Sequence, residues 1–169
     1  GIRKVNEKAL AMERAGETVL HFEIGRPDFD TPEYIKQAAN QALAQGKVHY
    51  TSNFGLMELR QAIADKLKRE NHVDYKASEV LVTVGLSEAV FAVLASLLDE
   101  GDELLVPDPV WLNYINVPNL LGAKAVTYSL KEENGYQMDL DEVRSKITSK
   151  TRGIVIVTPN NPTGGVLEE

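Results

Sequence analysis

The sequence contains no cysteine, which excludes disulfide bonds, thiolate catalysis and cysteine-ligated metal centres. It has no apolar run of the about 20 residues that a membrane span requires, and its first residues, GIRKVNEKAL, lack a signal-peptide core. Acidic residues outnumber basic ones by 25 to 18, giving a net charge of −7, which argues against a nucleic-acid surface. We expect a cytoplasmic protein with neither nucleic-acid nor membrane partners.

Histidine and tryptophan are also scarce. The three histidines, His21, His49 and His72, share no metal-ligand spacing, so we expect no metal site. The densest cluster of basic residues, KLKRE at 66–70, lies in a helical pattern, and we expect it to form a solvent-exposed helix face rather than a nucleic-acid surface. The only tryptophan is Trp111.

From residue 79 onward, short β-branched runs alternate with longer amphipathic stretches. The apolar runs are EVLVTV (79–84), ELLVP (103–107), KAVTYSL (124–130) and GIVIV (153–157). Such an alternation is typical of a parallel sheet whose faces are both covered by helices. The predicted fold class is therefore α/β.

Helices and one further strand are expected outside these runs. Residues 3–15 have a helical pattern, and TVLHFEIG (18–25) is predicted to be a short strand that ends at Gly25. Thr31 is expected to cap the next helix, with Pro32 as its first residue, because the missing N–H of proline costs nothing there. The apolar stripe from 56 to 67 predicts another helix.

Near the carboxyl end, Asp139 and Glu142 form a D-x-x-E capping signal for a helix. The final stretch, TPNNPTGGVLEE, turns after the last apolar run and stops where a further helix would begin. The first turn of a helix is unfavourable to form unless further residues extend the helix. We therefore expect the sequence to be a truncated part of a longer one.

The stretch VTVGLSEAV (82–90) allows two functional interpretations. As a variant of the G-x-S-x-G elbow it would present Ser87 as the nucleophile of a hydrolase, but that fold requires a histidine later in the chain, and all three precede Ser87. As a glycine turn opening a helix, Gly85, Leu86 and Ser87 would offer free backbone N–H groups and a hydroxyl to a phosphate. The second interpretation is favoured.

Two other side chains are expected at the same place. Trp111 follows the run at 103–107, and Asn161 follows the run at 153–157. Ligands of open α/β sheets bind outside the carboxyl ends of the strands, so an anion-binding turn, an indole and an amide would converge on one crevice. Each residue also has a purely structural explanation, such as a gap-filling tryptophan or an Asn-Pro turn. The combination favours a ligand.

With these motifs in view, the chain resembles the class I/II aminotransferases, which are fold-type I pyridoxal-phosphate (PLP) enzymes similar to aspartate aminotransferase. The segments that carry the resemblance, in the family's order, are GRPDFDTP, HYTSNFGLMELRQAIADKLKRE, VTVGLSEAV, EGDELLVPDPVWLNY and VTPNNPTGGV. It implies a three-layer αβα sandwich with an incomplete, mostly parallel sheet. Residues 1–30 would belong with the family's small domain, and 31–169 would form the first part of its large PLP-binding domain.

The resemblance also implies roles for individual residues. Gly85, Leu86 and Ser87 would bind the PLP phosphate, although many relatives have a second glycine in place of Leu86. Trp111 would stack on the pyridine ring, and Asn161 would donate to the phenolic oxygen of the cofactor. Two residues complete the implied site: Gly25 would lie near the substrate carboxylate, and Tyr50 would reach the phosphate of the partner subunit in a homodimer.

The implied reaction transfers an amino group between an amino acid and a 2-oxo acid. The lysine that holds PLP as a Schiff base has no counterpart in a matching context here, so this chain supplies no catalytic residue and is expected to be inactive alone. Three alternatives stay open: another fold-type I PLP enzyme such as a C–S β-lyase, a non-catalytic fragment or binding module, and a serine hydrolase using Ser87.

Overall fold

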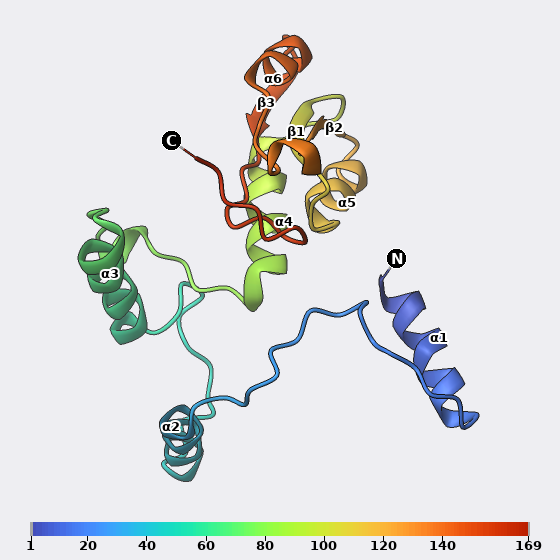
Figure 1. The fold of residues 1–169 in the computed structure, drawn as a ribbon. Coiled ribbons are helices and arrows are strands. Elements are labelled where there is room, and N and C mark those ends of the chain that lie inside the picture. Colours follow the sequence, from blue (N-terminus) through green and yellow to red (C-terminus); the bar gives the residue numbers. More distant parts are fainter. Residues whose placement is uncertain (1, 169) are drawn as a thin grey trace. The chain divides into compact units, whose positions relative to one another are not determined.

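The computed structural model describes residues 2–168 and divides the chain into two compact units, 1–50 and 51–169. Figure 1 shows the elements of each unit, and the units are described separately below. The boundary expected between residues 30 and 31 separates the small and large domains of the family that the chain resembles. It differs in kind from this division into units and stays a prediction.

The first unit contains helix α1 (Ile2–Arg14) and helix α2 (Glu33–Ala44). His21 joins α1 to the segment that follows it, with its Nε2 at 3.0 Å from Glu13 and its Nδ1 at 2.7 Å from Glu23. The hydrogen bond from Asn6 and the contact with His21 lower the pKa of Glu23 to about 2. These polar contacts attach the segment to the helix.

Two local predictions for this unit are wrong. The strand expected at 18–25 is not formed, because no described backbone pairs with that segment and extended chain becomes a strand only beside a partner. Helix α2 begins at Glu33, with Pro32 as its N-cap and no side-chain cap bond, so the expected cap at Thr31 lies one residue too early. The carbonyl of Pro32 accepts the first backbone bonds, from Ile35 and Lys36.

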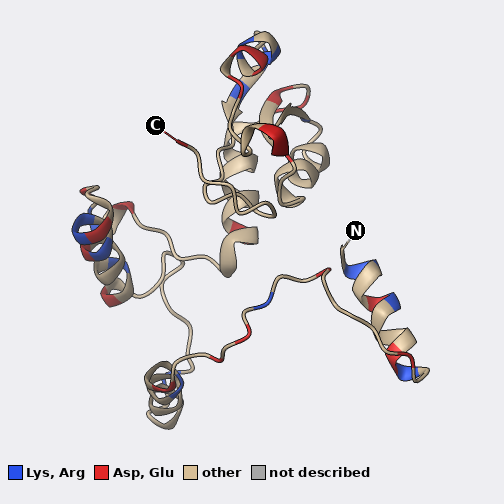
Figure 2. Cartoon of the chain, viewed as in Figure 1, with Lys and Arg blue, Asp and Glu red and all other residues tan. Residues whose placement is uncertain are grey.

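The second unit opens with α3 (Met57–Asn71) and the 3-10 turn η1 (Ala77–Glu79). Mixed charges cover α3 in Figure 2. Within the KLKRE run, Lys68 lies 3.3 Å from Asp74 and Arg69 lies 2.7 Å from Glu70, all four side chains being exposed. The prediction of a solvated face is confirmed.

The apolar run at 79–84 is not a strand, contrary to expectation. It is an extended segment held at two points: Arg60 Nε donates to the carbonyl of Val80 at 2.9 Å, and Val82 N–H donates to the carbonyl of Phe54 at 3.1 Å. Its composition suits a buried strand, but no ladder forms along it within the described residues. Composition alone does not provide the neighbouring strand that a ladder needs.

The other three apolar runs form a parallel sheet in the order β2-β1-β3. Its strands are β1 (Glu103–Asp108), β2 (Lys124–Ser129) and β3 (Thr151–Ile154). β1 lies in the centre, with Leu105 opposite Val126 on one side and Ile154 on the other. The predicted α/β class and parallel sheet are confirmed.

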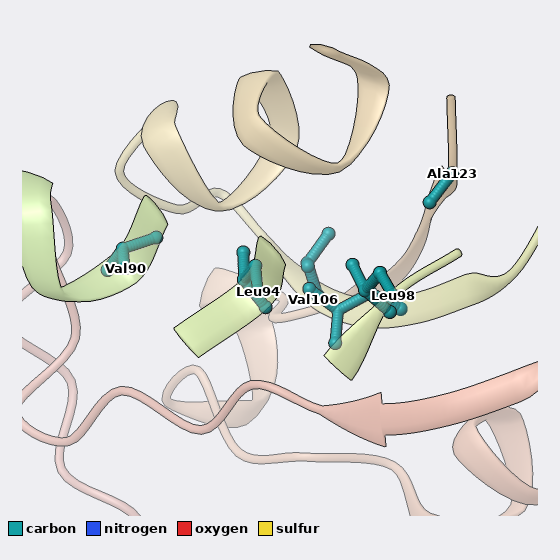
Figure 3. Close-up of a cluster of buried hydrophobic side chains, with 6 residues drawn as sticks. Val90, Leu94, Leu98, Val106 and Ala123 are labelled. Atoms are coloured by element: carbon teal, nitrogen blue, oxygen red, sulfur yellow. The ribbon is translucent and has the colours of Figure 1, made fainter. Parts of the chain in front are cut away.

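Helices α4 (Gly85–Leu97) and α5 (Asn113–Leu120) cover one face of this sheet. Val90, Leu94 and Leu98 pack with Leu104 and Val106 of β1, as the close-up in Figure 3 shows for several of these side chains. Other apolar residues of α4 that the pattern places in the core, such as Val93 and Leu97, stay more than half exposed. The sheet therefore covers only one side of this helix.

The opposite face is covered by α6 (Leu140–Lys146), which follows the 3-10 turn η2 (Glu132–Asn134). Leu105 and Tyr128 point to this side, where they pack with Leu130 and Val143. The Tyr128 hydroxyl donates to the carbonyl of Val155 at 2.7 Å, and burial raises the pKa of Tyr128 to about 12. Helices on both faces make a three-layer αβα arrangement.

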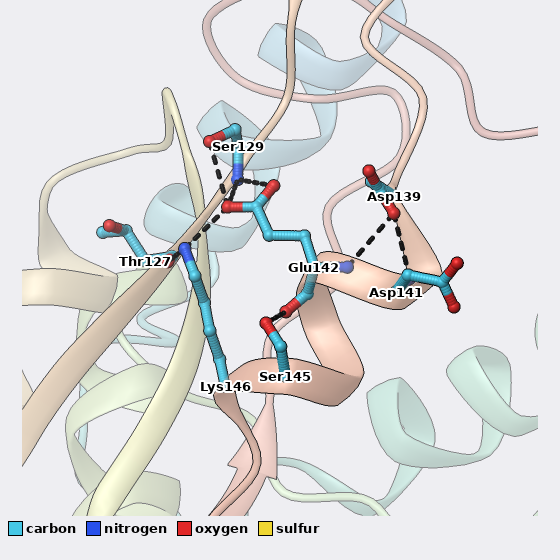
Figure 4. A network of polar contacts seen from close by, with 7 residues as sticks. All are labelled: Thr127, Ser129, Asp139, Asp141, Glu142, Ser145 and Lys146. Carbon is cyan, nitrogen blue, oxygen red and sulfur yellow. Dashed lines mark hydrogen bonds and ion pairs between the residues drawn. The ribbon is translucent and has the colours of Figure 1, made fainter.

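The predicted capping signal of α6 is half right. Asp139 is the N-cap, and its carboxylate accepts from the N–H groups of Asp141 and Glu142. The Glu142 carboxylate does not return to the cap. It accepts from Ser129 on β2 and lies 2.6 Å from Lys146, and it thereby fastens the helix to the sheet (Figure 4).

We expect Glu142→Gln to weaken the attachment of α6 and lower the thermal midpoint of the chain at neutral pH. Lys146 and Ser129 hold the pKa of Glu142 below its ordinary value of 4.5. A carboxyl with a depressed folded pKa stabilises fully above its unfolded pKa and loses this effect as the pH falls through the folded one. The difference between variant and wild type, followed by circular dichroism, should narrow below pH 4.5.

Asp141→Asn is the matched control, since Asp141 is on the same helix and its side chain is 90% exposed. It should change stability by no more than about 0.5 kcal/mol. Equal pH profiles for the two variants would contradict the assigned role of Glu142.

Candidate functional site

A cavity of about 340 Å³ opens at the carboxyl ends of β1 and β3. Its lining consists of Gly85, Leu86, Ser87, Trp111, Tyr114, Val157 and Asn161. Five of these are site residues expected from the sequence, drawn from three separate segments. The structure brings these five together, as the rule for ligands of parallel sheets anticipates.

The turn before α4 depends on a glycine. Gly85 has a φ of +72°, in the left-handed region that residues with a Cβ disfavour. The amides of Leu86 and Ser87 belong to the first turn of the helix and have no partner within it. The positive end of the helix dipole adds to these donors, so this turn suits an anion.

Ser87 carries the one hydroxyl in the cavity lining besides that of Tyr114. Its Oγ accepts a hydrogen bond of 3.1 Å from Nδ2 of Asn113, at the start of α5. Because the amide group is the donor, the Ser87 hydroxyl hydrogen stays available for an acceptor in the cavity. Among the described hydrogen bonds, the partner of Ser87 Oγ is Asn113 and not a histidine, the usual base beside a hydrolase nucleophile.

Sequence reasoning did not identify Asn113 or Glu88. The carboxylate of Glu88, in the first turn of α4, accepts from the N–H of Val84, the N-cap residue of this helix. This places a negative charge in the first turn of α4, where it competes with any anion for the helix dipole. Glu88 follows the N-cap Val84 by four residues, one more than in a capping box, so no motif in the sequence identified it.

Trp111 also lines the cavity. Its indole is partly buried against the α4–α5 side of the core and meets Tyr114 edge to face, with ring centroids 5.7 Å apart and an angle of 82°. Edge-to-face contact is the favoured geometry for two aromatic rings. This contact restrains the indole, which lines the cavity and is a flat ring on which another ring can stack.

Asn161 is exposed and lies in the loop after β3. The described hydrogen bonds assign no partner to its carboxamide, whereas its neighbour Asn160 is buried and donates two hydrogen bonds through Nδ2. The Asn161 side chain can therefore donate to a ligand at the cavity without first breaking a contact.

Gly25 and Tyr50 belong to the unit 1–50, whereas the cavity lining comes from the unit 51–169. Gly25 has open space around its Cα, and the ring of Tyr50 is fully exposed. Their expected roles toward substrate carboxylate and partner phosphate stay predictions.

Residues 2–168 contain no group of three or more histidine, cysteine, aspartate or glutamate side chains arranged to hold a metal ion. Each helix in the described part of the chain is too short or too polar to span a bilayer.

Comparison with known proteins assigns the chain to a family. The family model described as aminotransferase class I and II matches residues 17–169, so the chain belongs to the class I and II aminotransferases. This agrees with the resemblance drawn from the motifs.

Individual relatives are similar over nearly the whole chain. A probable aspartate/prephenate aminotransferase of Aquifex aeolicus is 45% identical over 165 residues, which are 98% of this chain and 42% of that protein. The aspartate/prephenate aminotransferase of Thermus thermophilus is 43% identical, covering 96% of this chain and 42% of the relative. The chain thus spans about two fifths of the length of these relatives.

Solved structures agree on the fold. An aspartate aminotransferase from Thermus thermophilus with maleate superimposes with a TM-score of 0.95 at 41% identity, covering 99% of this chain and 44% of that one. An alanine aminotransferase from Pyrococcus furiosus gives 0.94 at 40% identity, with coverages of 99% and 44%.

We expect Gly85→Ala to destabilise the chain by about 1–2 kcal/mol through backbone strain, because φ is positive there. Steric clash contributes nothing, since a Cβ at Gly85 would meet no atom within 4 Å. Denaturant unfolding measures the loss.

Gly25→Ala is the control, because its surroundings are equally open and its φ is not in the positive region. It should be neutral or stabilising by reducing the freedom of the unfolded chain. Equal losses at both positions would show that strain at Gly85 is not the cause.

Proposed function

We propose that the chain forms the PLP-binding part of an aminotransferase that exchanges an amino group between an amino acid and a 2-oxo acid. The observation that carries the proposal is the shared cavity of Gly85, Leu86, Ser87, Trp111 and Asn161. Membership of the class I and II aminotransferases supports it.

The chemistry of the lining fits a phosphorylated pyridine. The first turn of α4 offers backbone N–H groups and the Ser87 hydroxyl to a phosphate. The indole of Trp111 offers a flat surface for a ring, and Asn161 offers an amide N–H to a ring oxygen. At about 340 Å³, the cavity also falls in the range of small-molecule sites, about 300–1,000 Å³.

When bound, PLP supplies an electron-withdrawing ring that stabilises negative charge at the α-carbon of the substrate. The residues of this chain would bind and orient the cofactor. Ser87 would fix the phosphate end, and Trp111 would hold the plane of the ring. The amide of Asn161 would stabilise negative charge on the phenolic oxygen by donating to it.

Gly25 is proposed to lie near the substrate carboxylate, and Tyr50 to reach the phosphate of a partner subunit, which requires a homodimer. We further propose a cytoplasmic enzyme of amino-acid metabolism. Relatives are named for aspartate, prephenate and alanine, and the substrate pair of this protein is left at the level of its class.

Because no lysine of this chain occupies a matching context, we propose that the chain alone does not transaminate. A C–S β-lyase uses the same cofactor chemistry as an aminotransferase. In a longer protein that contains the Schiff-base lysine, comparing the turnover of cystathionine with that of an amino-acid/2-oxo-acid pair distinguishes the lyase from the aminotransferase. A binding module without turnover would bind the cofactor and do neither.

The direct test is binding of pyridoxamine 5′-phosphate, which cannot form imines with surface lysines. We expect it to quench the fluorescence of Trp111, the only tryptophan, in a saturable manner. Pyridoxamine, which lacks the phosphate, should bind much more weakly. Equal binding of the two compounds, or no saturable quenching, would remove the support for a phosphate site at α4.

Two substitutions at the turn should shift this affinity in opposite directions. Ser87→Ala removes a charge-assisted hydrogen bond and should weaken binding about tenfold. Glu88→Gln keeps the cap to Val84 but removes the competing negative charge, and should tighten binding about twofold to fivefold. Calorimetry gives both values, and a shift of the same sign in both variants would contradict the electrostatic argument.

A further inference from the structure

Asn160, the neighbour of Asn161, has no role in the site described so far. It is 5% exposed, although it is polar and lies in a loop. Its Nδ2 donates to the carbonyl of Pro109 at 3.1 Å and to Oγ1 of Thr163 at 3.1 Å. The first of these bonds joins segments 51 residues apart in the chain.

The orientation of this carboxamide is dictated by its partner. Pro109 presents a carbonyl oxygen, which only accepts, so the amino end of the amide must face it. The Oδ1 atom then points away and has no partner within the described residues. A buried acceptor left unsatisfied is unfavourable, so the Oδ1 atom of Asn160 lowers the stability of the loop.

The loop is closed around Asn160 by its backbone as well. Its N–H donates to the carbonyl of Gly165 at 2.8 Å, and its carbonyl accepts from the N–H of Gly164 at 2.8 Å. Thr163 Oγ1 also accepts from Gly165 N–H at 3.1 Å. The loop from 160 to 165 is therefore held by its own hydrogen bonds, and the bond to Pro109 connects it to the residue that follows β1.

Both ends of the Pro109 bond adjoin cavity residues. Pro109 follows the last residue of β1 and precedes Trp111 by two positions, while Asn160 precedes Asn161 directly. Trp111 and Asn161 line the same cavity from these two segments. Strands β1 and β3 already pair upstream of these segments. Beyond that ladder, within the described residues, the Asn160–Pro109 bond is the side-chain hydrogen bond that joins the two segments directly.

We propose that Asn160 is a positioning residue, which joins the loop of Asn161 to the turn of Trp111 and so sets the gap that receives the cofactor ring. The ring itself rests on the proposed function, but the link between the two segments does not.

The experiment replaces Asn160 by aspartate, which has the same shape but turns an acceptor toward the Pro109 carbonyl. Acrylamide quenching of Trp111 without ligand measures how exposed the indole becomes when the segment after β1 is released. Titration with pyridoxamine 5′-phosphate measures the affinity of the space between Trp111 and Asn161 for the ring. We expect greater quencher access to Trp111 and about tenfold weaker binding.

Asp102→Ala is the matched control. Asp102 is also buried, at 8% exposure, and its carboxylate accepts from Asp99 N–H at 3.0 Å and lies 3.1 Å from Nε of Arg152. It sits just before β1, at the opposite end of the strand from Pro109. This variant should lose stability but leave Trp111 access and ligand affinity unchanged.

Thr163→Val separates the two bonds of Asn160, because it removes the Thr163 acceptor and keeps the bond to Pro109. Trp111 access should then stay at the wild-type level. If Asn160→Asp does not fold, as judged by circular dichroism, Asn160→Ala removes the donor without adding a charge and should show the same changes.

The outcomes are distinguishable. Wild-type access and affinity in a folded Asn160 variant would overturn the proposal, as would equal changes in Asp102→Ala. If wild-type chain fails to bind pyridoxamine 5′-phosphate while Trp111 access still rises in Asn160→Asp, the cofactor assignment fails and the link between the segments stands.

Discussion

The burial of β1 between two layers of helices is the constraint on which the rest of the unit 51–169 depends. Leu105 and Val106 are almost inaccessible to solvent and point to opposite faces, so each layer must supply apolar partners. A fully buried side chain of this size contributes about 1.5–3 kcal/mol. Once β1 is fixed in this way, the segments that leave the carboxyl ends of β1 and β3 are brought to one edge.

The cavity at that edge combines three kinds of interaction that need little movement on binding. The helix start offers amides that are already aligned, the indole is held by Tyr114, and the hydrogen bonds of the described residues leave the Asn161 side chain unpartnered. Preorganised groups of this kind bind without a large ordering cost. The carboxylate of Glu88 is the opposing term, since it places negative charge at the same helix end.

The same unit leaves apolar surface uncovered. A second cavity, of about 280 Å³, lies between α4 and β3 and is lined almost wholly by apolar side chains. β3 is an edge strand of the described sheet, and the apolar run at 79–84 has no ladder. These features share one cause. The described sheet has only three strands, so it covers one side of α4 and offers the extended segment at 79–84 no strand to pair with.

The sequence by itself determined the α/β class, the three strands after residue 100, the cap at Asp139 and the five cavity residues that carry motifs. Those follow from periodicity, from glycine and proline chemistry, and from the rule that parallel strands present ligands at their carboxyl ends. Strands at 18–25 and 79–84 were predicted wrongly because apolar composition does not supply a pairing partner.

Only the tertiary structure decided which polar groups meet. Glu142 binds Ser129 rather than its own cap, Asn113 orients Ser87, and Asn160 reaches Pro109. Each of these contacts joins residues 13 to 51 positions apart, a separation at which no local periodicity constrains the partner. The choice is made when the layers pack, because a buried polar group must then find a partner among the atoms that packing brings near.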